Sequence, residues 1–327
     1  APHISPSNNR SRRQYILSVM AENGFISQEE KQAALDESIW VLAQEAEKQL
    51  YSWYIDEALR ESAELLGLSA DEVIQGGFRI YTAYDARLQT IADEVYADSS
   101  FFPAAASDGT PIQSAMAVVD TNNGAVLAMI GGRDYTVRRG LNRATQMRRQ
   151  PGSALKPLAV YGPALELGYT TASVLLDEKT SFGGYTPRNA GDRYYGLVTM
   201  RTAIRNSLNT TAVRLLEEIG LDASIQYLNK MGIPTRNSDR NLSLALGSMT
   251  YGVTPVELAA AYVPYANGGI YHQPYCVERI ETVDGSNIYE RKDSGKQVLS
   301  AQNAFLMTSL LQSVVSSGTG TRMLAAN

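Results

Sequence analysis

The sequence has very little of the chemistry that cysteine and histidine provide. Cys276 is the single cysteine among 327 residues, which excludes a disulfide framework within the chain and CxxC-type metal or redox sites. The two histidines, His3 and His272, are far apart in the sequence. A zinc site built on several histidines is therefore not expected, and a serine nucleophile with a histidine base would have to use one of these two residues.

Long apolar runs and an excess of positive charge are also lacking. No apolar stretch approaches the ~18 residues needed to cross a bilayer. Residues 1–9 are polar and rich in turn formers, which is not typical of a signal peptide. The formal net charge of -5 argues against a basic nucleic-acid-binding surface. With 44% hydrophobic and 19% charged residues, the chain can still build a sizeable core, and its length suggests about two domains.

The N-terminal part of the chain has mainly helical patterns. Residues 1–12 are expected to form a loop, and residues 13–23 have apolar positions at helical spacing that end at Gly24. Ser27 and Glu30 are typical of a capping box at the start of a second helix. The further elements expected before the next domain are a helix over 39–66 that ends at Gly67, a strand over 78–84, a helix over 87–98 and a linker over 99–113.

The clearest strand signal is a hairpin in which residues 114–119 and 125–130 flank Asn123-Gly124, a pair that supplies the positive φ angles of a tight turn. Both runs are apolar on both faces, so helices are expected on each side of this sheet. The chain after residue 150 is predicted to be mostly helical. A second hairpin is expected around Asp284-Gly285, from residues 271–283 and 287–291.

The first candidate for catalysis is the run of residues 151–157, Pro-Gly-Ser-Ala-Leu-Lys-Pro. Ser153 would begin a helix and Lys156 would lie three residues on, so both side chains share one helical face near the positive end of the helix dipole. A serine needs a base to become a nucleophile, and lysine is the remaining option without a usable histidine. Holding a lysine of pKa ~10.4 neutral at pH 7 costs about 4.6 kcal/mol, so burial, neighbouring cations or the dipole must lower its pKa. The alternative is an N-capping serine and a solvated lysine.

The second candidate is Ser207-Leu208-Asn209, between helices expected at 199–206 and 210–219. A hydroxyl and a carboxamide on one turn can share a proton network with a serine–lysine pair, and the amide can hold a peptide substrate. The alternative is an ordinary turn, because serine and asparagine are common turn residues. Three further features read more simply as structure: a flexible turn at 317–321, a small buried group at Cys276, and half-buried packing by Tyr194, Tyr195, Tyr262, Tyr265 and Tyr271, which could otherwise line a peptide or carbohydrate cleft.

Together these segments resemble class A penicillin-binding proteins, which are bifunctional peptidoglycan synthases. Residues 149–157 are similar to the active-serine segment of that family, and Ser207-x-Asn209 is similar to its second motif. Other similar stretches follow in the family's order, at 142–144, 201–210, 244–247, 252–259 and 266–269. Residues 13–34 resemble the tail of a glycosyltransferase domain, and 77–82 resemble the interdomain linker strand.

The resemblance implies an α/β penicillin-binding or serine transpeptidase fold, with a central, mainly antiparallel sheet covered by helices on both faces. We expect this fold to be incomplete in the chain and to follow a small helical and linker region. The implied boundaries are a glycosyltransferase tail at 1–37, a linker at 38–113 and a D,D-transpeptidase domain at 114–327. Two departures matter: the glycosyltransferase catalytic region is absent, and so is the Lys-Thr-Gly motif whose strand borders the family's cleft.

The resemblance also implies roles. Ser153 would attack the D-Ala-D-Ala carbonyl of a stem peptide, Lys156 would take the serine proton, Ser207 would relay a proton to the leaving amine, and Asn209 would hold the donor peptide. No metal or organic cofactor is implied. The implied partners are peptidoglycan stem peptides, β-lactams that acylate Ser153, the membrane through an anchor outside this chain, and as an option a separate C-terminal fragment carrying Lys-Thr-Gly, but no nucleic acid.

The implied location is the extracytoplasmic face of the bacterial plasma membrane. Two alternatives stay open, a β-lactam-binding sensor and a catalytically idle fragment. A serine β-lactamase is less favoured, because residues 201–209 and 252–259 match the synthase pattern.

Overall fold

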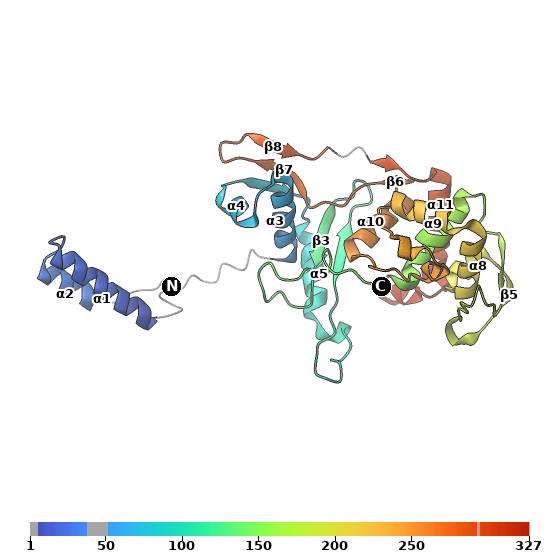
Figure 1. The fold of residues 1–327 in the computed structure, drawn as a ribbon, viewed down its shortest axis with the longest axis horizontal. Helices are drawn as coiled ribbons and strands as arrows, with labels where there is room; N and C mark the ends of the chain where they lie inside the picture. The colour runs from blue at the N-terminus through green and yellow to red at the C-terminus, as the bar shows by residue number, and fades with distance from the viewer. Residues whose placement is uncertain (1–5, 38–51, 293–294, 327) are drawn as a thin grey trace. The chain divides into compact units, whose positions relative to one another are not determined.

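The structure is a computed structural model that describes residues 6–37, 52–292 and 295–326 (Figure 1). The chain divides into two compact units, residues 1–50 and residues 51–327. The part of the expected 39–66 helix that precedes residue 52 lies outside the described residues.

The first unit contains two helices, α1 (Pro6–Glu22) and α2 (Gln28–Asp36). The prediction of a loop over residues 1–12 is wrong from residue 6 onward, because Pro6 begins α1; a proline fits the first helical turn, where an N–H has no helical partner. The predicted capping box of α2 is confirmed. The Glu30 N–H donates to Ser27 Oγ over 3.1 Å, and the Ser27 N–H donates to Glu30 Oε2 over 2.7 Å.

The second unit contains all the other described elements. Its helices are α3 (Trp53–Leu66), α4 (Ala70–Gln75), α5 (Ala86–Ala97), α6 (Gly162–Glu166), α7 (Met200–Arg205), α8 (Asn209–Ile219), α9 (Leu221–Lys230), α10 (Pro255–Ala266) and α11 (Ala301–Ser317). Its strands are β1 (Arg79–Thr82), β2 (Met116–Val119), β3 (Val126–Ile130), β4 (Val174–Asp177), β5 (Gly196–Thr199), β6 (Ile270–Tyr271), β7 (Val277–Glu281), β8 (Asn287–Glu290) and β9 (Lys296–Gln297). Gly67, at a φ of 66°, ends α3 as expected.

The paired strands run antiparallel, which confirms the predicted combination of helices with a mainly antiparallel sheet. Among the described residues they form four small sheets, in the orders β1-β7-β8, β2-β3, β4-β5 and β6-β9. Both predicted hairpins are present, with two differences. Of the Asn123-Gly124 pair only Gly124 has a positive φ, and the first strand of the second hairpin begins at Val277 and not at residue 271, because β6 pairs with β9 instead. In the first hairpin, Met116 pairs with Ile130; in the second, Arg279 of β7 pairs with Glu290 of β8.

The two outer edges of the β2–β3 hairpin differ in their hydrogen-bond partners. Along the outer edge of β3, the Gln89 side chain of α5 accepts from the Met129 N–H over 2.9 Å and donates to the Met129 carbonyl over 3.1 Å. The Tyr54 hydroxyl of α3 donates to the Val126 carbonyl over 2.6 Å. The Asp85 N–H also donates to the Leu127 carbonyl over 2.9 Å, and the Val126 N–H donates to the Tyr275 carbonyl over 2.8 Å. Side chains and neighbouring backbone thus satisfy this edge, whereas in the described part of the chain no strand pairs with the other edge of β2. A groove of about 950 Å³ borders that edge and is lined by residues of β2 and α10.

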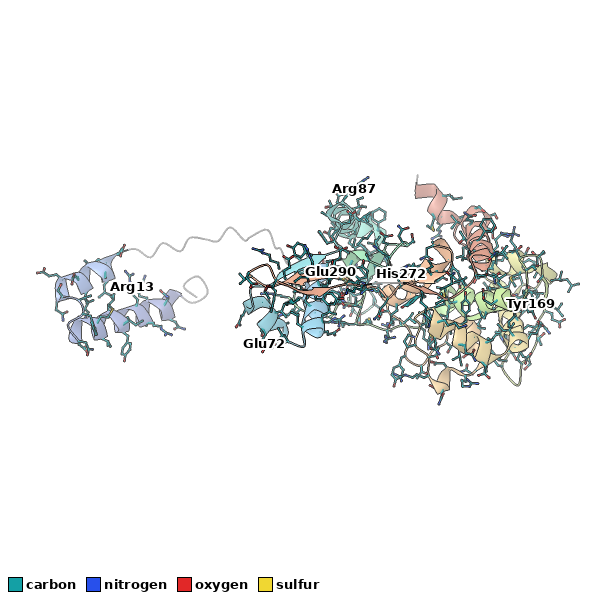
Figure 2. The ribbon with its side chains drawn as sticks, turned by 90° about the horizontal axis from the view of Figure 1, so that it is seen from above. Arg13, Glu72, Arg87, Tyr169, His272 and Glu290 are labelled. Carbon is teal, nitrogen blue, oxygen red and sulfur yellow. The ribbon has the colours of Figure 1, made fainter. Side chains whose placement is uncertain are left out.

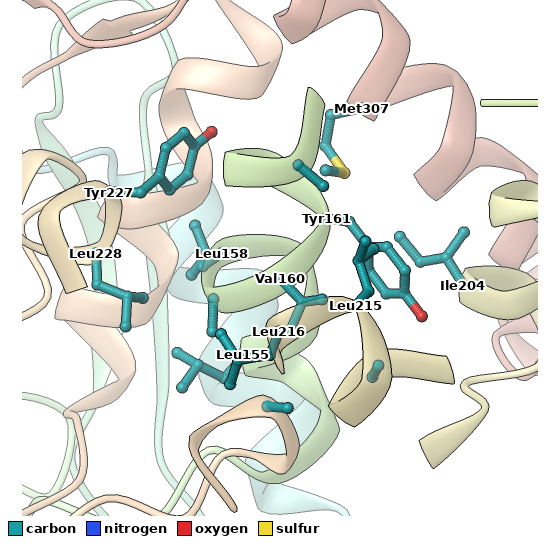
Figure 3. Packing of buried hydrophobic residues seen from close by; sticks show 14 of the residues in the cluster. Leu155, Leu158, Val160, Tyr161, Ile204, Leu215, Leu216, Tyr227, Leu228 and Met307 are labelled. Carbon is teal, nitrogen blue, oxygen red and sulfur yellow. The ribbon is translucent and has the colours of Figure 1, made fainter. Parts of the chain in front are cut away.

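The largest hydrophobic cluster surrounds the helical stretch of residues 152–166 (Figure 3). Leu155, Leu158 and Tyr161 of this stretch are fully buried against Leu215 of α8 and Leu228 of α9. Fully burying one leucine contributes about 1.5–3 kcal/mol, so this stretch is held firmly. In Figure 2, Tyr169 lies on this helical side of the unit, and Glu72 and Glu290 lie on the side of the small β1-β7-β8 sheet.

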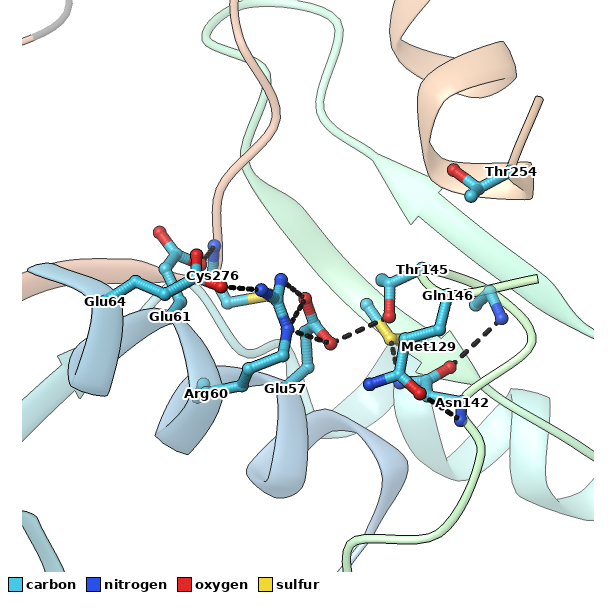
Figure 4. Close-up of polar contacts among 12 residues, drawn as sticks. Glu57, Arg60, Glu61, Glu64, Met129, Asn142, Thr145, Gln146, Thr254 and Cys276 are labelled. Carbon is cyan, nitrogen blue, oxygen red and sulfur yellow. Dashed lines mark hydrogen bonds and ion pairs between the residues drawn. The ribbon is translucent and has the colours of Figure 1, made fainter. Parts of the chain in front are cut away.

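A second contact ties α3 to the loop that leads toward residue 150 (Figure 4). Glu57 of α3 is only 5% exposed and accepts hydrogen bonds from Arg60 and from Thr145 Oγ1, the latter over 2.7 Å. A buried carboxylate is stable only where it is paired and hydrogen-bonded. The residues before Ser153 are therefore anchored to α3 as well as to the main core.

Candidate active site

Ser153 lies in an irregular helical segment rather than in a regular α-helix. Gly152–Leu155 form a 3-10 turn, Pro157–Tyr161 a π-helical turn, and α6 follows directly. Side chains at positions i and i+3 eclipse one another in a 3-10 turn, so the Ser153 and Lys156 side chains leave the backbone on the same side. Ser153 is exposed, whereas Lys156 is 2% exposed. The serine and the lysine thus lie one turn apart on one side, and of the three ways named for lowering the lysine pKa the structure shows burial.

Two glycines press against the backbone that carries this serine. A Cβ on Gly247 would lie 2.1 Å from the Gly152 carbonyl oxygen, and a Cβ on Gly252 would lie 2.2 Å from the Arg149 carbonyl oxygen. Both glycines have positive φ, 79° and 73°. Next to them, Val253 and Arg149 exchange backbone hydrogen bonds of 2.8 and 3.0 Å. Only glycine allows this close approach, which fixes the entry of the chain into the turn at Ser153.

Lys156 binds the second predicted motif through its ammonium group. Nζ donates to the Ser207 carbonyl over 2.6 Å, to Ser207 Oγ over 3.1 Å, to the Leu208 carbonyl over 3.2 Å and to Asn209 Oδ1 over 2.6 Å. The hydrogen bonds of the described residues include none between Nζ and Ser153 Oγ. The structure thus brings Lys156, Ser207 and Asn209 into contact and leaves Ser153 exposed beside them.

Burial changes the protonation of Lys156. Removal of the amine from water disfavours the charged form and lowers the pKa of Lys156 to about 8. A group near this value is protonated enough to hold the four oxygens and is deprotonated often enough to act as a base near neutral pH.

Ser207 has an unusual backbone conformation. Its φ is 53°, in the left-handed region that residues other than glycine rarely adopt. It lies between the end of α7 and the start of α8, as the sequence predicts. The strained conformation turns both its carbonyl and its hydroxyl toward Lys156 Nζ.

Asn209 is the first residue of α8, and its carboxamide is held at both ends. Oδ1 accepts from Lys156 Nζ, and Nδ2 donates to the Arg188 carbonyl over 2.6 Å. Its backbone N–H donates to Asn189 Oδ1 over 2.7 Å. The sequence did not point to Asn189, because one asparagine in a glycine-containing loop carries no motif. Nor did it point to Asp177, the fully buried carboxylate behind Asn189.

The other features singled out in the sequence make contacts that fit a role in the fold. Cys276 is buried, and burial raises the pKa of its thiol well above the ordinary value, so it is unreactive. Tyr262 donates its hydroxyl to the Ala154 carbonyl over 2.5 Å, next to Ser153. In the 317–321 stretch, the Thr319 N–H donates over 3.2 Å to the carbonyl of Arg205, two residues before Ser207.

Membrane-spanning helices and metal-binding clusters are both absent from the described ranges. None of the described helices is long and apolar enough to cross a membrane. The same ranges contain no group of three or more histidine, cysteine, aspartate or glutamate residues that could hold a metal ion.

Comparison with known proteins places the chain in a family. Residues 114–326 match the family described as penicillin binding protein transpeptidase domain. The chain is 40% identical over 325 residues to penicillin-binding protein 1F of Bacillus subtilis (strain 168), covering 98% of this chain and 44% of that protein. It is 33% identical over 330 residues to penicillin-binding protein 2a of Streptococcus pneumoniae (strain D39), covering 98% and 45%. The chain therefore spans less than half the length of these curated relatives.

Solved structures show the same fold. Penicillin-binding protein 1A from Haemophilus influenzae superposes with a TM-score of 0.78 at 21% identity, over 100% of this chain and 68% of that one. PonA1 from Mycobacterium tuberculosis in complex with penicillin V superposes with a TM-score of 0.68 at 23% identity, over 80% and 70%. Because the family match covers more than half of the residues, the chain belongs to the penicillin-binding proteins, and its transpeptidase domain is of the class A type.

Proposed function

We propose that the chain carries the D,D-transpeptidase site of a peptidoglycan synthase and that it cross-links stem peptides through an acyl-enzyme on Ser153. The observation that carries this proposal is the buried Lys156, with a pKa lowered to about 8, one 3-10 turn after an exposed serine. An amine in this position can accept the serine proton, which a solvated lysine at pH 7 cannot do.

The proposed reaction has two stages. Ser153 Oγ attacks the carbonyl carbon of the penultimate D-alanine as its proton passes to Lys156 Nζ. The amide C–N bond then breaks, and the terminal D-alanine leaves with the proton, relayed through Ser207 Oγ, which lies 3.1 Å from Nζ. An amine of a second stem peptide attacks the ester, the new amide bond forms as the ester C–O bond to Ser153 breaks, and the amine's proton returns through the same groups to Ser153 Oγ. Asn209 would hold the donor peptide with its carboxamide.

β-Lactams would enter the same reaction and stop halfway. Their strained amide resembles the D-Ala-D-Ala amide, so attack by Ser153 would leave a covalent ester. PonA1, a fold relative, has been solved with penicillin V. We extend penicillin binding to this chain as part of the proposal.

The remaining proposals concern segments that adjoin the transpeptidase domain. We propose that a segment carrying Lys-Thr-Gly, continuous or as a separate fragment, adds a strand that borders the cleft. This strand would supply one N–H of an oxyanion hole for the attacked carbonyl, and the N–H of Ser153 would supply the other. In the described part of the chain no strand pairs with the outer edge of β2, which supports a sheet that continues on this side. Residues 1–37 would be the end of a glycosyltransferase domain whose catalytic part lies elsewhere. The site would act at the extracytoplasmic face of the plasma membrane, through an anchor outside this chain.

Labelling with fluorescent penicillin tests the proposal. The full-length protein should acquire one label per molecule, located at Ser153 by peptide mapping, and Ser153→Ala should lose it. Ser248→Ala, at a partly buried serine of the same domain, is the matched control and should label like the parent. Equal labelling of the Ser153→Ala protein would refute the assignment.

One observation favours the alternative of an idle serine: Lys156 Nζ donates to four oxygens of residues 207–209 and to none of Ser153. An idle site would leave the parent protein unlabelled even at high penicillin concentration. A β-lactam sensor would label but would release no D-alanine from a pentapeptide when an acceptor amine is supplied. A transpeptidase does both.

A further inference from the structure

Helix α8 begins without a side-chain cap of its own. Its N-cap residue is Leu208, whose side chain cannot accept a hydrogen bond. The first N–H groups of a helix have no partner within the helix, and a buried N–H without a partner is costly. The start of α8 therefore needs an acceptor from elsewhere in the chain.

Asn189 supplies that acceptor from the loop between β4 and β5. Its Oδ1 accepts from the Asn209 N–H over 2.7 Å and from the Thr210 N–H over 3.3 Å. An asparagine side chain is among the best N-caps, but it normally belongs to the helix that it caps. Here the cap is 20 residues away in sequence and 5% exposed.

The other end of the Asn189 amide is held just as firmly. Nδ2 donates to Asp177 Oδ1 over 2.7 Å and to the Arg193 carbonyl over 2.9 Å. Asp177 is fully buried and also accepts from Thr210 Oγ1 and, over 2.9 Å, from the Tyr195 N–H. A carboxylate can only accept and a backbone N–H can only donate, so these partners allow a single orientation of the amide.

This orientation reaches the site through Asn209. Residue 188 accepts from Asn209 Nδ2, and residue 189 accepts from the Asn209 N–H, so two consecutive loop residues fix both the side chain and the backbone of Asn209. The other polar atom of the Asn209 side chain, Oδ1, is bound by Lys156 Nζ. A shift of the loop would therefore move the carboxamide that binds Lys156 and that, in the function proposed above, holds the donor peptide.

We propose that Asn189, oriented by Asp177, is a positioning residue that fixes the Asn209 carboxamide against Lys156. The proposal rests on the function proposed above for this site. Among the described residues, no hydrogen bond joins Asn189 to Lys156 or Ser153, so Asn189 acts through Asn209 and is not itself catalytic. Misplacement of a binding group by 1 Å can cost on the order of 10²-fold in rate, which sets the size of the expected effect.

A double-mutant cycle tests this proposal in the full-length protein. The change is Asn189→Leu, which keeps the shape of the side chain and removes its hydrogen bonds, made alone and in an Asn209→Ala background. The rate of acylation by fluorescent penicillin is measured at saturating penicillin, together with the melting temperature. We expect Asn189→Leu alone to slow acylation about 10- to 100-fold. In the Asn209→Ala background it should slow acylation less than about 3-fold, because coupled residues are not additive.

Asn142→Leu is the matched control. Asn142 is also buried, at 2% exposed, and its amide contacts the Ala144 N–H, the Trp53 carbonyl and Met129 but none of the site residues (Figure 4). Its substitution should lower the melting temperature and have the same small effect on acylation in both backgrounds. If Asn189→Leu does not fold, Asn189→Ala, which leaves room for water to solvate the freed groups, replaces it.

Two results would overturn the proposal. One is a parental acylation rate in both Asn189 variants. The other is the same fold-loss with and without the Asn209 side chain, which is what a purely structural role would give. Failure of the proposed function is distinguishable, because the parent protein itself would then not be labelled at Ser153.

Discussion

Lys156 is subject to two opposing effects. Four oxygen acceptors favour the charged form of the amine, whereas near-complete burial disfavours it. The effect of burial is the larger of the two, since the pKa is lowered to about 8. The same carbonyls that hold the amine thus do not prevent it from losing its proton. A surface lysine with the same sequence neighbours would remain charged at neutral pH.

The pH dependence of acylation should follow from this pKa. Only the neutral amine can accept the Ser153 proton, so the rate should rise with pH, reach half its maximum near pH 8 and level off above it. At pH 6 the neutral fraction is about 1%, so the rate should be roughly 100-fold below the plateau. Stopped-flow acylation by a chromogenic penicillin measures this profile.

Lys156→Met should remove the pH-dependent rise and slow acylation by about 10²–10⁴-fold, the usual contribution of a general base. Lys230→Met, at an exposed lysine at the end of α9, is the control and should keep the parental profile. A rate independent of pH between 6 and 9 in the parent protein would remove Lys156 from the role of base.

Ser207 combines backbone strain with two hydrogen bonds to Lys156. Its φ of 53° costs about 1–2 kcal/mol for a residue with a Cβ. Ser207→Gly and Ser207→Ala both remove Oγ, but only glycine relieves the strain. We expect both variants to acylate slowly and the glycine variant to melt about 2–4 °C above the alanine variant, as measured by calorimetry. Equal melting temperatures would mean that the backbone at this position is not strained.

The turn that carries Ser153 depends on a close contact between two backbone segments. The segments meet where Gly247 faces Gly152 and Gly252 faces Arg149. Neither contact involves a side chain, so its strength depends on the absence of Cβ atoms. The 3-10 and π-helical turns that follow are held on their other side by the large core cluster.

Gly247→Ala should therefore displace the serine segment. The new Cβ would meet the Gly152 backbone, which cannot move aside as a flexible side chain could, so both stability and acylation should fall. Gly168→Ala is the control: Gly168 also has positive φ, 94°, but a Cβ there would meet nothing within 4 Å. The control should lose about 1 kcal/mol of stability and no acylation rate. Equal acylation by both variants would show that the contact does not position Ser153.

The division of the whole chain into two units has a consequence for stability. All buried members of the three described hydrophobic clusters lie at Trp53 or beyond. Residues 6–37 form α1 and α2, and no residue of α2 is buried. The second unit therefore contains the apolar burial that drives its folding.

A protein that begins at Ser52, and so keeps the N-cap of α3, should fold like the parent. Its main thermal transition should lie within about 2 °C of the parental one, and Ser153 should acylate at the same rate. Differential scanning calorimetry and penicillin labelling measure both. A protein that begins at Tyr54 lacks Trp53 of the third cluster and should melt at a lower temperature. A large loss on removal of residues 1–51 would show that the first unit supports the second.

Much of the local structure was predictable because it depends on neighbours in sequence. The capping box at Ser27 and Glu30, the stop at Gly67 and the hairpin around Asn123-Gly124 are decided by short-range hydrogen bonds and by backbone freedom. The loop predicted for residues 1–12 was wrong because polar residues such as Asn8 and Asn9 favour turns yet are tolerated in a helix that Pro6 begins. The motifs that contain Ser153 and Ser207 were predictable because each is a short pattern of residue types.

The amino-acid order alone determined which chemical groups are available: a serine three residues before a lysine, and a second serine two residues before an asparagine. Only the tertiary structure decided that Lys156 is buried, that it contacts residues 207–209, and that Asn189 and Asp177 support Asn209. The reason is physical. A pKa shift depends on how much water the surrounding elements exclude, and a cap supplied from another loop depends on how strands and helices pack. Neither property is contained in any short stretch of sequence.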